Sequence, residues 1–157
     1  KIELASNRED LQYKLAQSAD LLKNTGIDVT ICNSEAEVIW GKLLRLNAVA
    51  SFTAAYQKEI GEIRVNSKLR ADMKIFINES LIIAALDNYQ RNVDEIIDQI
   101  DNLPSNLTTS LQRDVMVGRL SELESITGGV LKIGLKNNIN LPMHLLIYNK
   151  ILSQLHG

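Results

Sequence analysis

The sequence is poor in cysteine and in aromatic residues. It holds one cysteine, Cys32, so no disulfide can form within the chain. A lone free thiol is typical of a reducing compartment, and we expect a cytoplasmic protein. Aromatic residues make up only 4% of the chain. That content is too low for a platform on which nucleic-acid bases stack.

An excess of charge of one sign is also lacking. The formal net charge is -2, which implies no general attraction to nucleic acid or to an acidic membrane surface. The longest apolar run, residues 81–86, is far shorter than the roughly 20 residues that a membrane-spanning helix needs. The two histidines, His144 and His156, have no partners at metal-ligand spacing. We therefore expect no metal, membrane or nucleic-acid partner, and predict ordinary surface or capping roles for both histidines.

Apolar residues recur at helical spacing along most of the chain, and the pattern predicts a mainly all-α protein. The exception is near the start, where Ile27, Val29 and Ile31 alternate as in a strand. Residues 1–4 are able to pair with that strand. Helices are predicted over residues 8–24, 34–56, 66–87, 93–103, 110–117, 122–136 and 144–155.

One lysine of the second predicted helix stands on a face that is otherwise nearly apolar. Lys42 shares this face with Leu46, Ala50 and Thr53. Partial burial favours the neutral form of a lysine and suits it to proton transfer near neutral pH. Alternatively, the lysine stem covers apolar surface while its ammonium group reaches water. Spacing alone leaves both interpretations open.

Ser121 and Glu124 have the spacing of a capping box ahead of the predicted helix 122–136. Glu122 would then lie in the first helical turn, where the helix dipole favours a carboxylate. The capping box accounts for Ser121 and Glu124 but leaves Glu122 free to face a site. A structural and a functional role for Glu122 both remain.

Three blocks of residues resemble, in order and spacing, the C-terminal domain of the ketopantoate reductases (2-dehydropantoate 2-reductases). Together they extend over nearly all of residues 36–155. The blocks are Trp40, Lys42 and Leu43 with Thr53-Ala54 and Ile60-Gly61-Glu62-Ile63; Ser110-Leu111-Gln112, Asp114, Gly118-Arg119, Ser121-Glu122-Leu123-Glu124 and Gly128; and Gly134 with Asn140 to Pro142.

The resemblance implies a helical domain like the C-terminal domain of 6-phosphogluconate dehydrogenase, with a short two-stranded remnant at its N-terminus. Residues 1–33 would be the tail of an N-terminal nucleotide-binding domain and its linker. Residues 34–157 would be the helical substrate-binding and dimerisation domain, and a homodimer is expected. The Rossmann domain that binds NADPH would be missing from this chain, so we expect the chain to be inactive alone.

The resemblance also implies an activity, the NADPH-dependent reduction of a small 2-keto acid, as in the conversion of ketopantoate to pantoate in pantothenate biosynthesis. Lys42 would be the catalytic proton donor to the carbonyl oxygen. Ser110 would help to hold the substrate. Glu122 would bind at the substrate and nicotinamide-ribose end of the cleft, contacting both substrate and cofactor.

On the face of Lys42, two positions depart from the family pattern. Leu46 and Ala50 stand where the best-known members carry asparagines that contact the lysine and the substrate. Asn47 is about 100° around the helix and should not replace them. The pocket is therefore expected to be more apolar. Two alternatives follow: a reductase of the same build for a different, more apolar 2-keto acid, or a non-catalytic helical interaction module.

Overall fold

The computed structural model describes residues 1–119 and 122–155. The chain divides into two compact units, residues 1–42 and 43–157. The boundary between them falls within helix α2 (Glu35–Tyr56). In the described part of the chain, no helix is long and apolar enough to cross a membrane.

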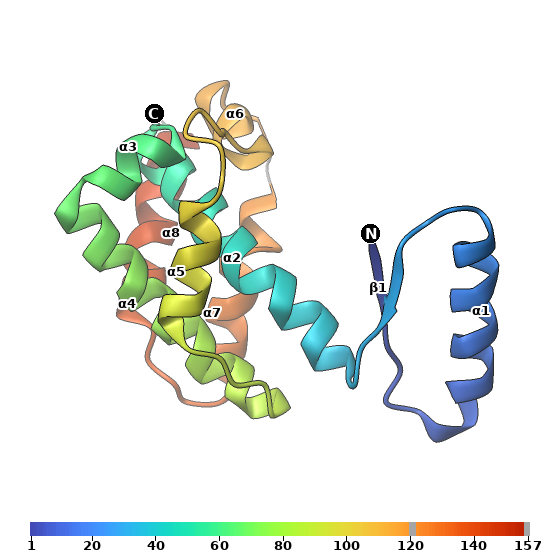
Figure 1. Cartoon of the computed structure of the whole chain (residues 1–157). Coiled ribbons are helices and arrows are strands. Elements are labelled where there is room, and N and C mark those ends of the chain that lie inside the picture. Colours follow the sequence, from blue (N-terminus) through green and yellow to red (C-terminus); the bar gives the residue numbers. More distant parts are fainter. Residues whose placement is uncertain (120–121, 156–157) are drawn as a thin grey trace. The chain divides into compact units, whose positions relative to one another are not determined.

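The first unit contains a parallel pair of strands joined by a helix (Figure 1). Strand β1 (Ile2–Leu4) pairs with β2 (Val29–Ile31), with Ile2 opposite Val29. Parallel neighbours need a crossover connection, which is supplied by the 3-10 turn η1 (Glu9–Leu11) and helix α1 (Gln12–Asn24). Ala19 of α1 is fully buried where the helix packs on β2. The prediction of a short two-stranded piece at the start of the chain is confirmed.

Local signals end α1 and begin α2. Gly26 adopts a φ of +83°, and its N–H donates to the carbonyl of Lys23 at 2.9 Å. Glycine reaches this left-handed conformation without the steric cost that other residues incur, so it closes the helix. At the start of α2, the Ser34 hydroxyl accepts from the backbone N–H of Glu37 at 3.1 Å. The Ser34 side chain therefore caps α2, and the Glu37 carboxylate accepts in turn from the N–H of Asn33 at 3.0 Å.

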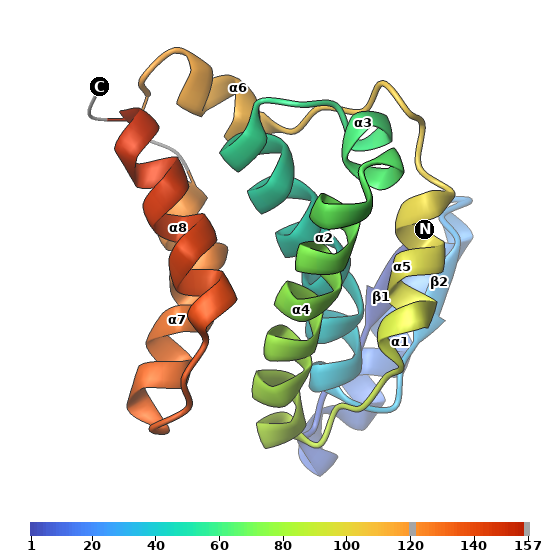
Figure 2. The same ribbon diagram turned by 90° about the vertical axis from the view of Figure 1, so that its left-hand side faces the viewer.

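The second unit is helical, as predicted, and α4 is in contact with α3, α5, α7 and α8. Figure 2 shows α7 and α8 side by side, and the two helices are in contact. Besides the rest of α2, the elements are α3 (Ile60–Val65), α4 (Ser67–Ala84), the 3-10 turn η2 (Ala85–Asp87), α5 (Val93–Asp101), α6 (Ser110–Met116), the 3-10 turn η3 (Glu122–Glu124), α7 (Thr127–Lys136) and α8 (Pro142–Leu155).

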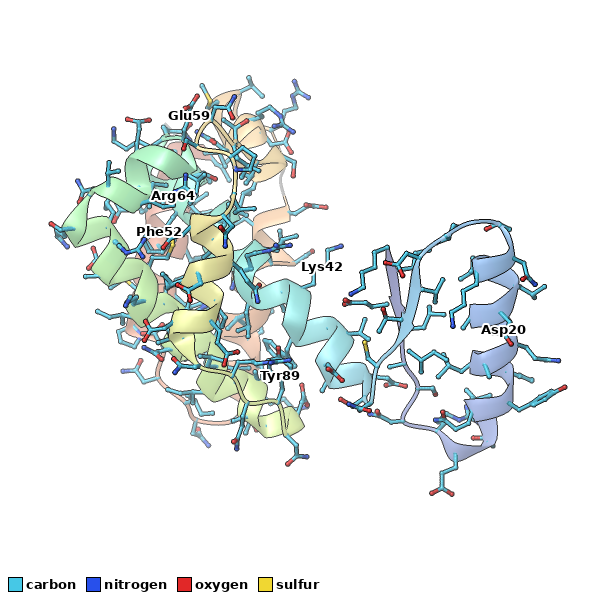
Figure 3. All side chains as sticks on the ribbon, viewed as in Figure 1. Asp20, Lys42, Phe52, Glu59, Arg64 and Tyr89 are labelled. Carbon is cyan, nitrogen blue, oxygen red and sulfur yellow. The ribbon has the colours of Figure 1, made fainter. Side chains whose placement is uncertain are left out.

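The core of this unit is built around two phenylalanines. The rings of Phe52 on α2 and Phe76 on α4 meet edge to face, with centroids 5.6 Å apart. Both side chains are fully buried, together with Ile147 and Ile151 of α8. Burial of each such side chain contributes about 1.5–3 kcal/mol. Figure 3 shows Phe52 within the helical body.

One detail differs from the sequence prediction. The predicted helix 122–136 is interrupted, because the N–H groups of Ser125 and Ile126 both donate to the carbonyl of Glu122 and close a separate turn. Glu122 therefore lies in η3 and not in the first turn of α7. The predicted capping role of Ser121 lies outside the described residues.

Candidate functional site

A cavity of about 310 Å³ lies in the second unit, lined by α2, by the chain between α5 and α6, and by the segment around η3. Ser110 and Glu122, which the sequence singled out from two distant positions, both line it. So do Leu46 and Ala50, the two residues that depart from the family pattern. The fold thus brings three separate parts of the sequence to one hollow.

The wall that α2 contributes is mostly apolar. Arg45, Leu46, Val49 and Ala50 line it at the spacing of neighbouring turns on one helix face. Val49 and Ala50 are buried, and Leu46 is 37% exposed. Leu103, Leu107 and Ile126 add further apolar surface from the other segments. The α2 wall of the cavity is therefore apolar at Leu46 and Ala50, the two positions that depart from the family pattern.

Three consecutive hydroxyl groups form a polar edge of the cavity. The Thr109 hydroxyl lies 2.9 Å from that of Thr53 and accepts from the N–H of Gln112 at 3.2 Å. The Thr108 hydroxyl accepts from the Arg113 guanidinium at 3.3 Å. The exposed Ser110 side chain has no hydrogen bond to any residue that the structure describes. Its hydroxyl is therefore free to donate to, or accept from, a bound molecule.

Helix α3 binds residues 105–107, which lead into this polar edge. The N–H groups of Ile60 and Gly61 donate to the carbonyls of Leu107 and Ser105 at 3.2 and 2.9 Å. A Cβ added at Gly61 would lie 2.8 Å from both the Cβ and the carbonyl oxygen of Ser105. Only glycine permits so close an approach of two backbones. This close contact gives a physical reason for the glycine in the Ile60-Gly61-Glu62-Ile63 block.

Arg64, labelled in Figure 3, supports the same segment. Its guanidinium donates to the carbonyls of Ile100, Asp101 and Leu103 at 3.0, 2.6 and 2.9 Å, and to the Ser105 hydroxyl at 2.9 Å. A planar guanidinium presents several donors in a fixed geometry, so one side chain satisfies the last carbonyls of α5 and the loop that follows. The cavity edge is thereby fixed by groups that do not line it.

Two charged side chains of opposite sign line the cavity. Glu122 is exposed, and Arg45 is half-buried. They form no ion pair with each other, and neither side chain has an ion pair or hydrogen bond with any other residue of the described ranges 1–119 and 122–155. The cavity thus has an anionic group, a cationic group and an apolar wall, all available to a ligand.

Lys42 lies on α2, four residues before Leu46. The sequence suggested partial burial on an apolar face, but the structure has the side chain exposed (Figure 3). Its neighbours on the helix are uncovered as well, since Ile39 is 56% and Leu46 37% exposed. Of the two interpretations that the sequence left open, the partly buried lysine was wrong, and an ammonium group that reaches water fits the exposed side chain.

The sequence prediction for His144 as an ordinary surface or cap residue was also wrong. Its ring is fully buried and stacks on Phe76, with centroids 3.7 Å apart. Its Nδ1 lies 2.7 Å from Oε2 of the buried Glu79, and its Nε2 lies 3.0 Å from the Ser80 hydroxyl. The Glu79 carboxylate also accepts from the N–H groups of Met143 and His144 at 2.8 and 2.9 Å. Glu79 therefore caps the start of α8 from inside the core.

This buried polar cluster continues to α2 and α7. The Asn47 amide nitrogen lies 3.4 Å from Nε2 of His144, and its oxygen accepts from the Ser51 and Thr127 hydroxyls at 3.0 and 3.2 Å. Asn47, Ser51 and Thr127 are all fully buried. Asn47 is the residue that the sequence placed away from the substrate positions, and its side chain forms hydrogen bonds within the core. The sequence contains a signal for this cluster that the prediction missed. Glu79 and Ser80 follow Phe76 by three and four residues, so they share its otherwise apolar helix face.

Burial lowers the pKa of the His144 imidazole, and the hydrogen bond and charge of Glu79 offset only part of that effect. Burial by itself raises the pKa of the Glu79 carboxyl, but the hydrogen bonds from His144 and from two backbone N–H groups outweigh it, so the net shift is downward. The arrangement fits a neutral imidazole whose Nδ1–H donates to an ionised carboxylate. Its Nε2 then accepts from Ser80 and faces the Asn47 amide.

Comparison with known proteins agrees with this architecture. The chain matches the family model described as ketopantoate reductase PanE/ApbA C terminal over residues 36–154. No curated protein gives a significant sequence match to the chain. Solved structures do match, at sequence identities that establish a common fold only.

Three of these solved structures illustrate the likeness. A D-mandelate dehydrogenase with NADH and anilino(oxo)acetate matches with a TM-score of 0.85 and 16% identity, over 98% of this chain and 66% of that one. A dimeric ketopantoate reductase from Staphylococcus aureus matches with a TM-score of 0.84 and 21% identity, over 99% and 54%. A PanE/ApbA family ketopantoate reductase from Ralstonia eutropha JMP134 matches with a TM-score of 0.81 and 18% identity, over 98% and 51%.

The chain thus spans between about half and two thirds of the length of these neighbours. The matched family model covers most of the chain and includes every element from α2 to α8. The chain belongs to the ketopantoate reductase family, an oxidoreductase family, in which it corresponds to the helical C-terminal domain.

Proposed function

We propose that the chain is the substrate-binding domain of an NADPH-dependent reductase that converts a small 2-keto acid to a 2-hydroxy acid. The observation that carries the proposal is the cavity in which Ser110, Glu122, Leu46 and Ala50 meet. Membership of the ketopantoate reductase family makes ketopantoate the first candidate substrate.

In this proposal, hydride adds to the C2 carbonyl carbon while the carbonyl oxygen takes a proton from the Lys42 ammonium group. The exposed ammonium stabilises the developing alkoxide before it delivers the proton, and solvent then restores the charge on the lysine. The free Ser110 hydroxyl on the cavity edge is available to hold the substrate by a hydrogen bond. Lys42 would thus act on the reacting oxygen, and Ser110 would fix the position of the substrate.

The nicotinamide cofactor, when bound, supplies the hydride. Within this chain, Glu122 fits a role beside it, because its carboxylate is exposed and has no ion partner among the described residues, and a carboxylate is a good acceptor for a ribose hydroxyl. We assign most of the cofactor contacts to a nucleotide-binding domain of which residues 1–33 form the tail. The parallel strands with a crossover helix support this assignment, because such a unit is the repeating element of nucleotide-binding folds.

A second candidate is a reductase of the same build for a more apolar 2-keto acid. It is favoured by the wall of Leu46, Val49 and Ala50, which offers no hydrogen-bond donor from its side chains to a substrate hydroxyl. Ketopantoate carries a hydroxyl group on its side chain, and burying it against this wall without a partner costs free energy. A keto acid with a branched aliphatic or aromatic side chain avoids that cost.

The test is the oxidation of NADPH by the full-length polypeptide that contains these residues, over ketopantoate and a panel of apolar 2-keto acids. We expect turnover with at least one of them. The Lys42→Ala variant is expected to lose 100-fold or more of kcat, on the order of the contribution of a general acid, with a smaller change in KM. Undiminished turnover by Lys42→Ala would contradict the proton-donor role. No turnover with any keto acid would favour the non-catalytic helical module.

We also propose a homodimer formed through the helical domain. Leu145 and Leu146 on α8 are 50% and 54% exposed, which is apolar surface suited to contact with a second copy. One structural neighbour is described as a dimeric ketopantoate reductase. Sedimentation equilibrium of the wild-type chain and a Leu145→Gln, Leu146→Gln double variant checks the proposal. A wild-type monomer at high concentration would refute it.

A further inference from the structure

Arg45 is a cation at the apolar wall of the cavity, and no residue that the structure describes serves as its counter-ion. Its side chain is half-buried on α2 and lines the hollow with Leu46, Val49 and Ala50. It makes no ion pair or side-chain hydrogen bond with any residue in the described part of the chain. A guanidinium that loses part of its hydration without gaining a partner is costly unless an anion binds to it.

The other cavity groups define which end of a ligand Arg45 would receive. The only other charge among the described lining residues is the Glu122 carboxylate, which would repel an anion. The rest of the lining is apolar or carries hydroxyl groups. A ligand with one carboxylate and an apolar body would therefore be oriented with its carboxylate toward Arg45 and away from Glu122.

We propose that Arg45 is the carboxylate anchor of this cavity, and that the ligand class is a monocarboxylate with an apolar side chain. This inference rests on the proposed 2-keto acid reductase, because it names the group that binds the carboxylate of that substrate. A guanidinium suits the task, since its parallel N–H donors match the two oxygens of a carboxylate. Leu46, Val49 and Ala50 would hold the side chain of the ligand.

Calorimetric titration of the full-length polypeptide, without reduced cofactor so that no turnover occurs, tests the anchor. The probes are 4-methyl-2-oxopentanoate, its neutral primary amide, and 4-methylpentanoate, which lacks the keto group. We expect the wild-type protein to bind both carboxylates more tightly than the amide. Arg45→Gln should weaken binding of the carboxylates about ten- to a hundredfold and leave the amide unchanged, as expected for loss of a charge-assisted hydrogen bond. Arg45→Lys should retain part of the preference, because the charge remains but the paired donors are lost.

The matched control is Arg91→Gln, which removes one arginine charge from a residue that does not line the cavity and is paired with Glu95. It should leave all three affinities unchanged. Equal binding of acid and amide by the wild-type protein, or unchanged carboxylate binding by Arg45→Gln, would overturn the anchor. Absence of carboxylate binding by the wild-type protein would overturn it too, and Arg45 would then only cover apolar surface with its stem.

The same experiment separates this inference from the proposed reductase. Tight binding of 4-methylpentanoate and the keto acid alike, lost in Arg45→Gln, supports the anchor even when NADPH oxidation shows no turnover. If the protein turns over a keto acid and Arg45→Gln does not change the KM for that keto acid, the anchor is contradicted, while the reductase proposal stands.

Discussion

The carboxylate of Glu79 and the imidazole of His144 form a buried hydrogen-bonded pair, with Oε2 2.7 Å from Nδ1. Glu79 lies on α4 and His144 at the start of α8, so the pair joins two helices that are distant in sequence. The same carboxylate accepts from two backbone N–H groups at the start of α8. One side chain thus satisfies three donors, two of which would otherwise be buried without this acceptor, so we expect the stability to depend strongly on Glu79.

Replacement of Glu79 by alanine should destabilise the helical unit severely. Three donors, two of them buried, lose their acceptor, and the His144 imidazole remains in the core without its partner. We therefore expect the free energy of unfolding to fall by about 3 kcal/mol. Urea denaturation followed by circular dichroism measures the change. Glu95→Ala is the control, because the 3.6 Å contact of Glu95 with Arg91 lies on the surface and should contribute less than about 1 kcal/mol. Equal effects of the two substitutions would contradict the capping role of Glu79.

The stability should fall as the pH decreases below neutrality. The pKa of His144 is lowered by burial from its ordinary value of 6.5, so the unfolded chain takes up a proton before the folded chain does. The free energy of unfolding should be constant above that value, decline as the pH falls below it, and level off once the folded imidazole is protonated. Glu79, whose pKa is lowered from 4.5, adds a second loss below that pH, because the folded state favours the ionised carboxylate.

Urea titrations between pH 4 and 8 follow this loss, and the NMR titration of the His144 ring reports its pKa directly. A folded-state His144 pKa above 6.5 would contradict the neutral imidazole inferred from the hydrogen bonds of Nδ1 and Nε2. In that case stability would rise as the pH falls through the ordinary value.

Gly61 should not tolerate a side chain. The Cβ of an alanine would lie 2.8 Å from the Ser105 backbone oxygen, so α3 and the segment that carries Thr108 to Ser110 must move apart. We expect a loss of about 1–3 kcal/mol in the free energy of unfolding and weaker ligand binding at the cavity edge. Gly129→Ala in α7 is the matched control. Its Cβ meets nothing within 4 Å, so this substitution should be neutral or stabilising by up to about 1 kcal/mol.

Leu46→Asn should change the substrate preference of the proposed reductase. The substitution places an amide on the apolar cavity wall, where it can pair with a substrate hydroxyl. We expect kcat/KM to rise for ketopantoate relative to an apolar keto acid such as 4-methyl-2-oxopentanoate, by about tenfold for one added hydrogen bond. Leu46→Met keeps the wall apolar and serves as the control. If both variants have the same substrate preference, this wall does not determine the specificity.

Helical periodicity was sufficient to predict the main helices, because burial of one face imposes a repeat of 3.6 residues on the sequence. It was not sufficient for α3, which has six residues and too few turns to show a repeat. It also missed the break before α7, where two N–H groups share the Glu122 carbonyl. Short turns depend on single hydrogen bonds, and these leave no periodic signal.

The candidate site was predicted in part. Ser110, Glu122, Leu46 and Ala50 were named from the sequence, and all four line one cavity. Arg45 was not named, although it precedes Leu46 directly, because a charged residue on a helix is usually a solvated one. Asn47 was set aside as a substrate ligand for its direction on the helix, and the structure has it buried in the polar cluster of the core.

The sequence by itself determined the helical class, the strand pair at the start of the chain and the family to which the chain is similar. These follow from the order of residues along the chain, through periodicity, capping residues and spacing. Only the tertiary structure decided that His144 is buried against Glu79, that Lys42 is exposed and that Arg45 lines the cavity with no ion pair to a described residue. Burial and pairing depend on what packs against a residue from elsewhere in the chain, and a one-dimensional pattern does not specify that neighbour.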